Sequence, residues 1–208
     1  FKQKTAYEIR PRDWSLDVCS SDLTALSLRF VPRRSTGTAE QIALVQLYDS
    51  CLRDFLAPAV NEAGLAGVDI SFDVGPEGFR LSASGYGDSA LRAARHIADR
   101  VLTFTVTPER FASLKDAALR GLRSYPQTEA YLLARDRRDA LAREIQFLPS
   151  ELLAPTERAE WTEVQKAGRK FFAGGQLEAV VHGHVAPETV AKELRALRDR
   201  SEEHTSEL

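Results

Sequence analysis

The stretch VDISFDVGPEGFRLSA, residues 68–83, decides the fold of this chain. On both sides of the turn GPEG at residues 75–78, apolar side chains alternate with polar ones: Val68, Ile70, Phe72 and Val74 before the turn, and Phe79, Leu81 and Ala83 after it. Alternation with a period of two is typical of strands that bury one face, and a short turn joins antiparallel neighbours. The sequence therefore predicts a β-hairpin whose apolar side chains share one face.

The segment before the hairpin predicts a strand and a long helix. Leucine and phenylalanine alternate with polar residues over residues 26–30, and Pro32 ends this strand. Thr38 followed by Gln41 has the spacing of a capping box, and an apolar stripe continues from there to Pro58. We therefore expect a helix that begins after Thr38 and ends at Pro58.

The segment after the hairpin predicts four helices, a strand and a last helix. The helical patterns occupy residues 90–102, 108–124, 129–146 and 157–172, the strand pattern residues 177–182, and the last helical pattern residues 187–197. The resulting order is β-α-β-β-α-α-α-α-β-α. Such an order is α+β, with a mainly antiparallel sheet and helices packed on one face, in a single domain.

Both ends of the chain differ from its interior. Residues 1–23 and 200–208 show no apolar periodicity, and the first stretch lacks the ordered regions of a signal peptide. One codon choice for residues 200–206, AGATCGGAAGAGCACACGTCT, has a reverse complement that encodes DVCSSDL, residues 17–23, one base out of frame. We therefore interpret residues 1–23 and 200–208 as translated sequencing-adapter sequence around a domain at residues 24–199, and expect neither end to pack on the core.

Charge and composition exclude several classes of function. Residues 24–199 hold 23 basic and 23 acidic side chains, so the formal charge of −2 comes from the two ends. A neutral domain gives no electrostatic basis for binding nucleic acid, and no apolar run approaches the ~18 residues that span a membrane. Cys51 lies beside leucines and is expected in the core. Nineteen arginines against four lysines in this range indicate a GC-rich bacterial gene.

Two short motifs could carry chemistry. His182 and His184 would share one face of a strand, but zinc needs three or four ligands and no ligand cluster lies nearby in sequence. We expect His182 to pack and His184 to be solvated, with metal binding as the minor alternative. Residues 85–89, GYGDS, resemble a phosphate loop but follow a hairpin strand, so we interpret them as a turn with a helix cap.

Several strings together resemble one protein family. The most specific part is residues 47–111, with LYDS at 47–50, NEAGLAG at 61–67 and GYGDS at 85–89, and VVHGHVAPETV follows at 180–190. Over residues 26–197 the chain resembles the third of four homologous domains in the pitrilysin and insulin-degrading-enzyme (insulysin) family of zinc metallopeptidases. The resemblance implies a metallohydrolase fold like that of mitochondrial processing peptidase, with four α+β domains forming two half-shells that close around a peptide.

The zinc motif of that family is missing. The first of the four domains carries H-x-x-E-H on the helix after its opening strand. The equivalent helix here, residues 39–55, reads AEQIALVQLYDSCLRDF, without histidine, and holds Leu44, Val45 and Tyr48 where ligands could lie. The resemblance therefore implies a domain with no catalytic residue, metal ligand or cofactor of its own, and zinc in the first domain of the parent enzyme.

The resemblance implies a function and leaves one alternative. The function is that of a non-catalytic middle domain of a zinc metalloendopeptidase, which helps to form the closed chamber for peptide substrates. Its partners are the other domains of the same peptidase and those peptides. The alternative is an inactive scaffold or pseudoenzyme subunit that pairs with a separate catalytic chain. An unrelated enzyme that uses His182 and His184 remains a minor possibility.

Arg80 and Asp88, near the ends of the second hairpin strand, are the candidate substrate contacts. The competing interpretation is that each is a solvated charge. The resemblance leaves the compartment open between the periplasm and the cytoplasm of a bacterium, and favours the periplasm.

Overall fold

The computed structural model describes residues 22–32, 37–143, 145–172 and 175–206. Its strands are β1 (Leu23–Pro32), β2 (Asp69–Gly75), β3 (Gly78–Tyr86) and β4 (Gly175–Gly183). Its helices are α1 (Ala39–Leu65), α2 (Ser89–Leu102), α3 (Pro108–Ser124), α4 (Ala130–Ala142), α5 (Pro149–Arg158), α6 (Trp161–Phe172) and α7 (Pro187–Ser206). A short 3-10 helix, η1 (Tyr125–Gln127), separates α3 from α4.

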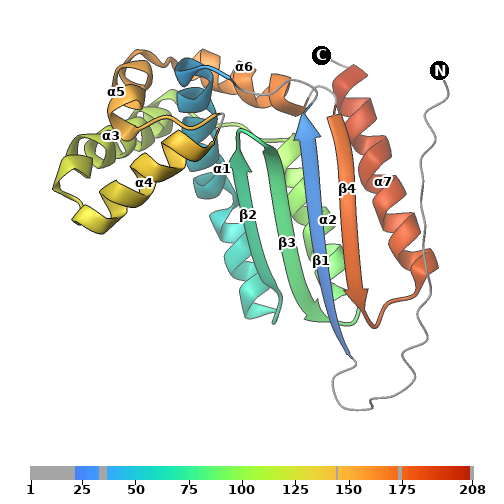
Figure 1. Cartoon of the computed structure of the whole chain (residues 1–208). Coiled ribbons are helices and arrows are strands. Elements are labelled where there is room, and N and C mark those ends of the chain that lie inside the picture. The colour runs from blue at the N-terminus through green and yellow to red at the C-terminus, as the bar shows by residue number, and fades with distance from the viewer. Residues whose placement is uncertain (1–21, 33–36, 144, 173–174, 207–208) are drawn as a thin grey trace, which may run out of the picture.

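One sheet organises the domain. Its strand order is β2-β3-β1-β4, and every neighbouring pair is antiparallel. Helices α1 and α2 lie behind the sheet in Figure 1, α7 lies beside β4 and packs against α2, and no described helix covers the front face of the sheet. Helices α5 and α6 pack against α1 at one side. The predicted class, α+β with helices on one face of a mainly antiparallel sheet, is confirmed.

The hairpin forms as predicted. Phe72 on β2 lies opposite Leu81 on β3, and the ring of Phe72 lies 6.3 Å, centroid to centroid, from that of Phe79. Phe79 and Leu81 are buried, whereas Phe72 is half-buried because β2 is an edge strand. Gly78 in the turn has a φ of 134°, and a Cβ there would collide with the backbone carbonyl of Phe30, so this position requires glycine.

The core lies between the covered face of the sheet and the helices behind it. Buried and exposed residues alternate along β1, as the sequence predicts, because one face of that strand is against the helices. The core joins side chains of β1, β3, α1 and α2, including Leu26, Leu28, Leu47, Leu52, Leu56, Leu81, Leu91 and Ile97. No described helix is long and apolar enough to cross a membrane.

Helix α1 continues past Pro58, where the sequence predicts its end. Pro58 lies inside the helix on an exposed side, and α1 ends at Leu65. A proline within a helix removes one backbone hydrogen bond and disturbs the preceding turn. The apolar stripe nevertheless continues with buried Ala59 and with Val60 and Ala63 against the core. Their burial offsets the local cost of the proline, so the prediction of a stop at Pro58 is wrong.

The segment after α4 contains one helix more than predicted. The helix expected at residues 157–172 corresponds to α6, and α5 precedes it in a segment where no separate helix was predicted. Helix α4 ends at Ala142 rather than at residue 146. Helix α5 begins with Pro149 in its first turn, and Glu151 accepts a hydrogen bond from the backbone N–H of Leu148 at 2.7 Å. Pro155 inside α5 hides the helical pattern, although Pro149 and Glu151 are start signals that could have revealed it.

The interpretation of the two ends falls partly outside the described residues. Residues 1–21, including Trp14 and Val18, and residues 207–208 belong to the part that is not described. Leu23 is the first residue of β1 and is half exposed. Helix α7 extends to Ser206, beyond the predicted end at residue 197.

Helices α1 and α3 are tied together by an ion pair. The guanidinium of Arg110 on α3 donates from Nε to Oδ2 of Asp54 on α1 at 2.8 Å, and from Nη2 to the other carboxylate oxygen. These hydrogen bonds hold the pKa of Asp54 below its usual range. The paired geometry fixes the orientation of α3 against α1.

Candidate functional site

Side chains from all four strands meet on the uncovered face of the sheet. Residues directly opposite one another in antiparallel strands project to the same face, so the register defines rows across the sheet. In the order β2, β3, β1 and β4, one row is Ser71, Ser82, Ser27 and Val180, and the next is Asp69, Ser84, Ala25 and His182. A shallow depression of about 290 Å³ lies over them. Its small residues are called the serine floor: Ala25, Ser27, Ser71, Ser82 and Ser84.

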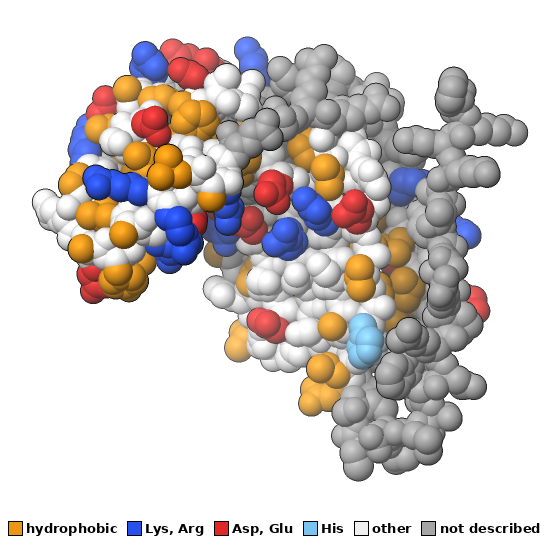
Figure 2. All heavy atoms as spheres, viewed as in Figure 1, with side chains coloured by type: hydrophobic (Ala, Val, Ile, Leu, Met, Phe, Trp, Pro, Cys, Tyr) orange, Lys and Arg blue, Asp and Glu red, His pale blue; other side chains and the backbone are white. Residues whose placement is uncertain are grey.

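The row beside the serine floor is charged across its whole width. It is called the charged row, and consists of Asp73, Arg80, Arg29 and Glu178. Figure 2 shows acidic and basic side chains together in a band across the sheet, above a paler area of small and polar residues. Arg29 pairs with Glu77 at 3.6 Å and with Glu178 at 3.9 Å. Asp73 pairs with Arg53 of α1 at 3.5 Å.

The structure separates the two predicted substrate contacts. Arg80 lies on the uncovered face within the charged row, and forms no ion pair with a carboxylate of the described residues. Asp88 lies past the end of β3 at the N-cap of α2, where its carboxylate pairs with Arg92 at 3.2 Å. The side chain of Asp88 does not cap the helix. Only Arg80 therefore belongs to the uncovered face.

The histidine pair is split by the end of the last strand. β4 ends at Gly183, so His182 lies in the strand on the uncovered face and His184 lies beyond it. Both side chains are exposed, so the expectation that His182 packs is wrong. The reason is that His182 lies on an edge strand whose residues are exposed along most of its length. Among the described residues, no three His, Cys, Asp or Glu side chains are grouped to hold a metal ion.

Helix α1 does not fit a zinc ion at the positions that carry the family motif. Val45 and Tyr48 are buried and Leu44 is partly buried against the core. The ring of Tyr48 meets that of Phe104 edge to face at 5.1 Å, and burial raises the pKa of Tyr48. An apolar, filled site without a carboxylate or imidazole offers zinc no ligand.

Cys51, one turn further along α1, is a core residue as predicted. Its thiol is free and buried. Burial, followed by the nearby charge of Asp54, raises the pKa of Cys51 to about 11. A thiol that remains protonated at neutral pH is a poor nucleophile, so Cys51 does not form a catalytic site.

A second depression lies between α1 and the edge strand β2. Its volume is about 450 Å³, and its walls include Val45, Asp49, Val74 and Phe147. The carboxylate of Asp49 accepts the backbone N–H of Val74 at 3.2 Å and the Nε–H of Arg53 at 2.7 Å. Asp49 therefore satisfies a backbone N–H group that edge strand β2 would otherwise leave unpaired. Local sequence patterns give no sign of this contact, because it joins residues 25 positions apart.

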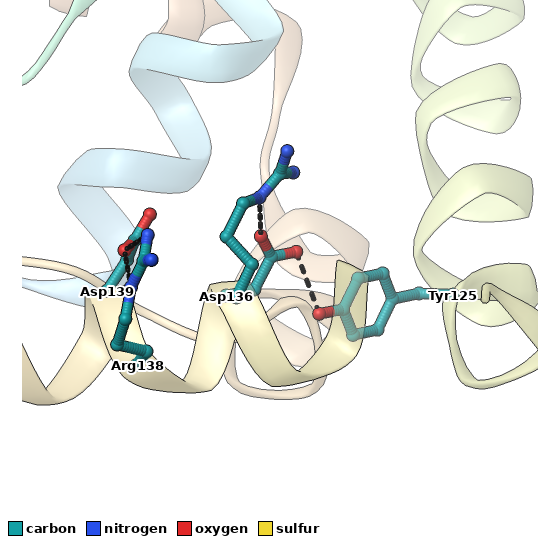
Figure 3. A network of polar contacts seen from close by, with 5 residues as sticks. Tyr125, Asp136, Arg138 and Asp139 are labelled. Atoms are coloured by element: carbon teal, nitrogen blue, oxygen red, sulfur yellow. Dashed lines mark hydrogen bonds and ion pairs between the residues drawn. The ribbon is translucent and has the colours of Figure 1, made fainter. Parts of the chain in front are cut away.

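Helix α4 is held by a polar network at the end of the domain opposite α7, as seen in Figure 1. Figure 3 shows the hydroxyl of Tyr125 donating to Asp136 at 2.9 Å, and Arg138 paired with Asp139. Burial and the hydrogen bond to Asp136 raise the pKa of Tyr125. The hydrogen bonds of Arg138 lower the pKa of Asp139. The hydrogen bond from Tyr125 links η1 to α4, whereas Arg138 and Asp139 are neighbours on α4 itself. These residues form no cluster of catalytic groups.

The fold is that of a peptidase domain of known structure. The crystal structure of pitrilysin superimposes on this chain with a TM-score of 0.80 and 16% sequence identity, covering 92% of this chain and 20% of pitrilysin. Residues 24–155 match the family described as the middle or third domain of peptidase M16, and the chain belongs to that family. The predicted resemblance is thereby confirmed.

Curated relatives are much longer than this chain. Human insulin-degrading enzyme is 22% identical over 161 residues, which cover 77% of this chain and 16% of the human protein. The A-factor-processing enzyme of Saccharomyces cerevisiae is 23% identical over 145 residues, covering 70% of this chain and 14% of the yeast protein. The chain thus spans about a sixth of the human relative. A middle domain implies further domains of the same protein as its partners.

Proposed function

We propose that this chain is the non-catalytic middle domain of a pitrilysin-type zinc metalloendopeptidase, and that its uncovered sheet face forms part of the wall of the chamber that binds peptides. The observation that carries the proposal is a polar sheet face backed by helices, in a domain whose α1 holds Leu44, Val45 and Tyr48 at the positions of the zinc motif. Permanent interfaces between domains are rich in apolar side chains, whereas serines and charges suit a surface in contact with water. The serine floor and the charged row therefore favour a chamber wall.

The parent enzyme supplies the chemistry in this proposal. Its first domain holds the zinc, and the middle domain contributes by enclosing and positioning the peptide, which lowers the entropic cost of reaching the reactive geometry. Arg80 is the proposed substrate contact on the wall. Asp88 contacts substrate only in a peptide long enough to reach the N-terminus of α2.

The chain by itself is expected to bind no stoichiometric zinc and to cleave no peptide. Activating water needs a metal, three protein ligands and a base, and α1 places Leu44, Val45 and Tyr48 where those ligands would lie. Metal analysis after dialysis at neutral pH, with a fluorogenic peptide assay, checks this. Tight zinc binding that disappears in a His182→Ala, His184→Ala double variant would overturn it.

Charge reversal at Arg80 in the intact enzyme tests the chamber wall. Arg80→Glu should raise KM by about two- to fivefold for a long peptide and leave kcat unchanged, because one exposed charge contributes up to about 1 kcal/mol to binding. Arg120→Glu, on α3 and away from the sheet, is the matched control. An unchanged KM for short and long peptides would show that Arg80 does not contact the substrate.

The sequence of the intact gene distinguishes the peptidase from the scaffold alternative. A segment H-x-x-E-H encoded upstream in the same reading frame supports the peptidase, whereas a separate catalytic chain supports a scaffold subunit.

A further inference from the structure

Two arginines face each other at the centre of the charged row. Arg29 on β1 and Arg80 on β3 are register partners, and both project to the uncovered face. Like charges directly opposite each other in a sheet lower its stability. The matching positions of the next row hold Ser27 and Ser82, which have no such repulsion. The arginine pair therefore lowers the stability of the sheet locally, whereas the serine pair in the next row does not.

Among the residues that the structure describes, the acidic side chains around the pair leave Arg80 without an ion-pair partner. The carboxylate of Asp73, its neighbour on β2, pairs with Arg53 of α1. Glu178 lies on the far side of Arg29 and is 3.9 Å from it, longer than a hydrogen bond. Exposed pairs at such distances contribute little and exchange readily with other partners. Within the described part of the chain, the guanidinium of Arg80 is thus available to an external anion.

The pair borders a surface that can hold the rest of a ligand. Ser27 and Ser82 of the serine floor lie in the row next to Arg29 and Arg80, and the depression over the floor has a volume of about 290 Å³. Small side chains leave room for an extended chain, and their hydroxyls donate and accept hydrogen bonds. Guanidinium groups bind carboxylates through two parallel N–H···O bonds. A chain on the floor can therefore place a carboxylate at the arginines.

We propose that Arg80, assisted by Arg29, binds a carboxylate of a peptide whose chain lies over the serine floor. The inference deepens the proposed function and rests on it for the nature of the ligand, whereas the charge preference rests on the arginine pair. The carboxylate is either the C-terminus of the peptide or an aspartate or glutamate side chain, since both present the same two oxygens.

Three related probes test the preference with the 208-residue chain. They are an N-acetylated alanine-serine hexapeptide with a free C-terminus, the same peptide as its C-terminal amide, and the amide with a glutamate in the middle. Binding is followed by shifts of backbone NMR signals from β1 and β3. The free acid should bind about tenfold more tightly than the amide, and Arg80→Gln should abolish this difference. The glutamate-containing amide shows whether a side chain can replace the C-terminus.

Two further variants separate recognition from general charge. Arg80→Lys keeps the charge but loses the two-point geometry, and should retain only part of the preference. Arg92→Gln removes an exposed arginine of α2, which pairs with Asp88 outside the charged row, and should leave the preference unchanged. Equal binding of all three peptides, or an equal loss in Arg92→Gln, overturns the inference while the chamber-wall function stands. Failure of every peptide to bind at millimolar concentration contradicts both.

Discussion

Replacing Leu81 by alanine should lower the free energy of unfolding by about 2–5 kcal/mol, which is among the largest effects expected for a single residue of this domain. Leu81 is fully buried on β3, between Leu28 of β1 and Phe72 of β2. Removal of its side chain loses apolar contacts and leaves a cavity that strands paired on both sides cannot close. Urea unfolding followed by circular dichroism measures the change.

Ser82→Ala is the matched control for this experiment, because Ser82 is the next residue of the same strand and faces the uncovered side. Its free energy of unfolding should change by less than about 0.5 kcal/mol. Similar losses for Leu81→Ala and Ser82→Ala would show that the two faces of the hairpin are not distinguished as described. Phe79→Ala belongs to the covered face and should cost about 3–5 kcal/mol.

Adding a single methyl group at Gly168 should destabilise the domain, although alanine is the better helix former. A Cβ at Gly168 on α6 would overlap the ring of Tyr48 on α1. That ring is buried and held edge to face by Phe104, so it cannot move aside without disturbing the core. Such overpacking costs about 1–3 kcal/mol. Thermal and urea unfolding of Gly168→Ala measure the loss.

Gly64→Ala provides the opposite expectation in another helix. Gly64 lies in α1 with open space around the position of a Cβ. Alanine there should raise the free energy of unfolding by about 0.5–1 kcal/mol through its helix propensity alone. In a Tyr48→Ala background the cost of Gly168→Ala should shrink, because the overlapping ring is gone. Destabilisation by Gly168→Ala that persists unchanged in that background would contradict the overlap.

Local patterns predicted the elements whose sequence signals are short-range. The hairpin follows from alternation about a GPEG turn. Helix α1 begins directly after Thr38, its N-cap, because the Thr38 hydroxyl accepts a hydrogen bond from the backbone N–H of Gln41 as the capping box requires. Pro58 and Pro155 misled the prediction of helix boundaries, since packing of the adjoining apolar residues outweighs the proline locally. Helix propensity depends on neighbouring residues, whereas burial depends on elements that are distant in sequence, so a local pattern does not reveal it.

The candidate site was harder to predict than the fold. Sequence identified Arg80 as a polar residue in an alternating strand, but its relation to Arg29 depends on the register of β1 and β3, strands that lie far apart in sequence. The same holds for the contact of Asp49 with the backbone of β2. Both arginines are polar residues of alternating strand patterns. Only a known strand order and register would have shown that they lie opposite each other.

The pairing of β1 with β4 has a consequence for how the chain is made. β1 is a central strand, yet β4 begins roughly ninety residues after the end of β3. At a translation rate of about 5–20 residues per second, β1 on a nascent chain waits on the order of ten seconds for its second neighbour. During that interval its free edge can pair with another polypeptide. Arg29 in the middle of β1 places a charge on this temporary edge, which disfavours association between nascent copies.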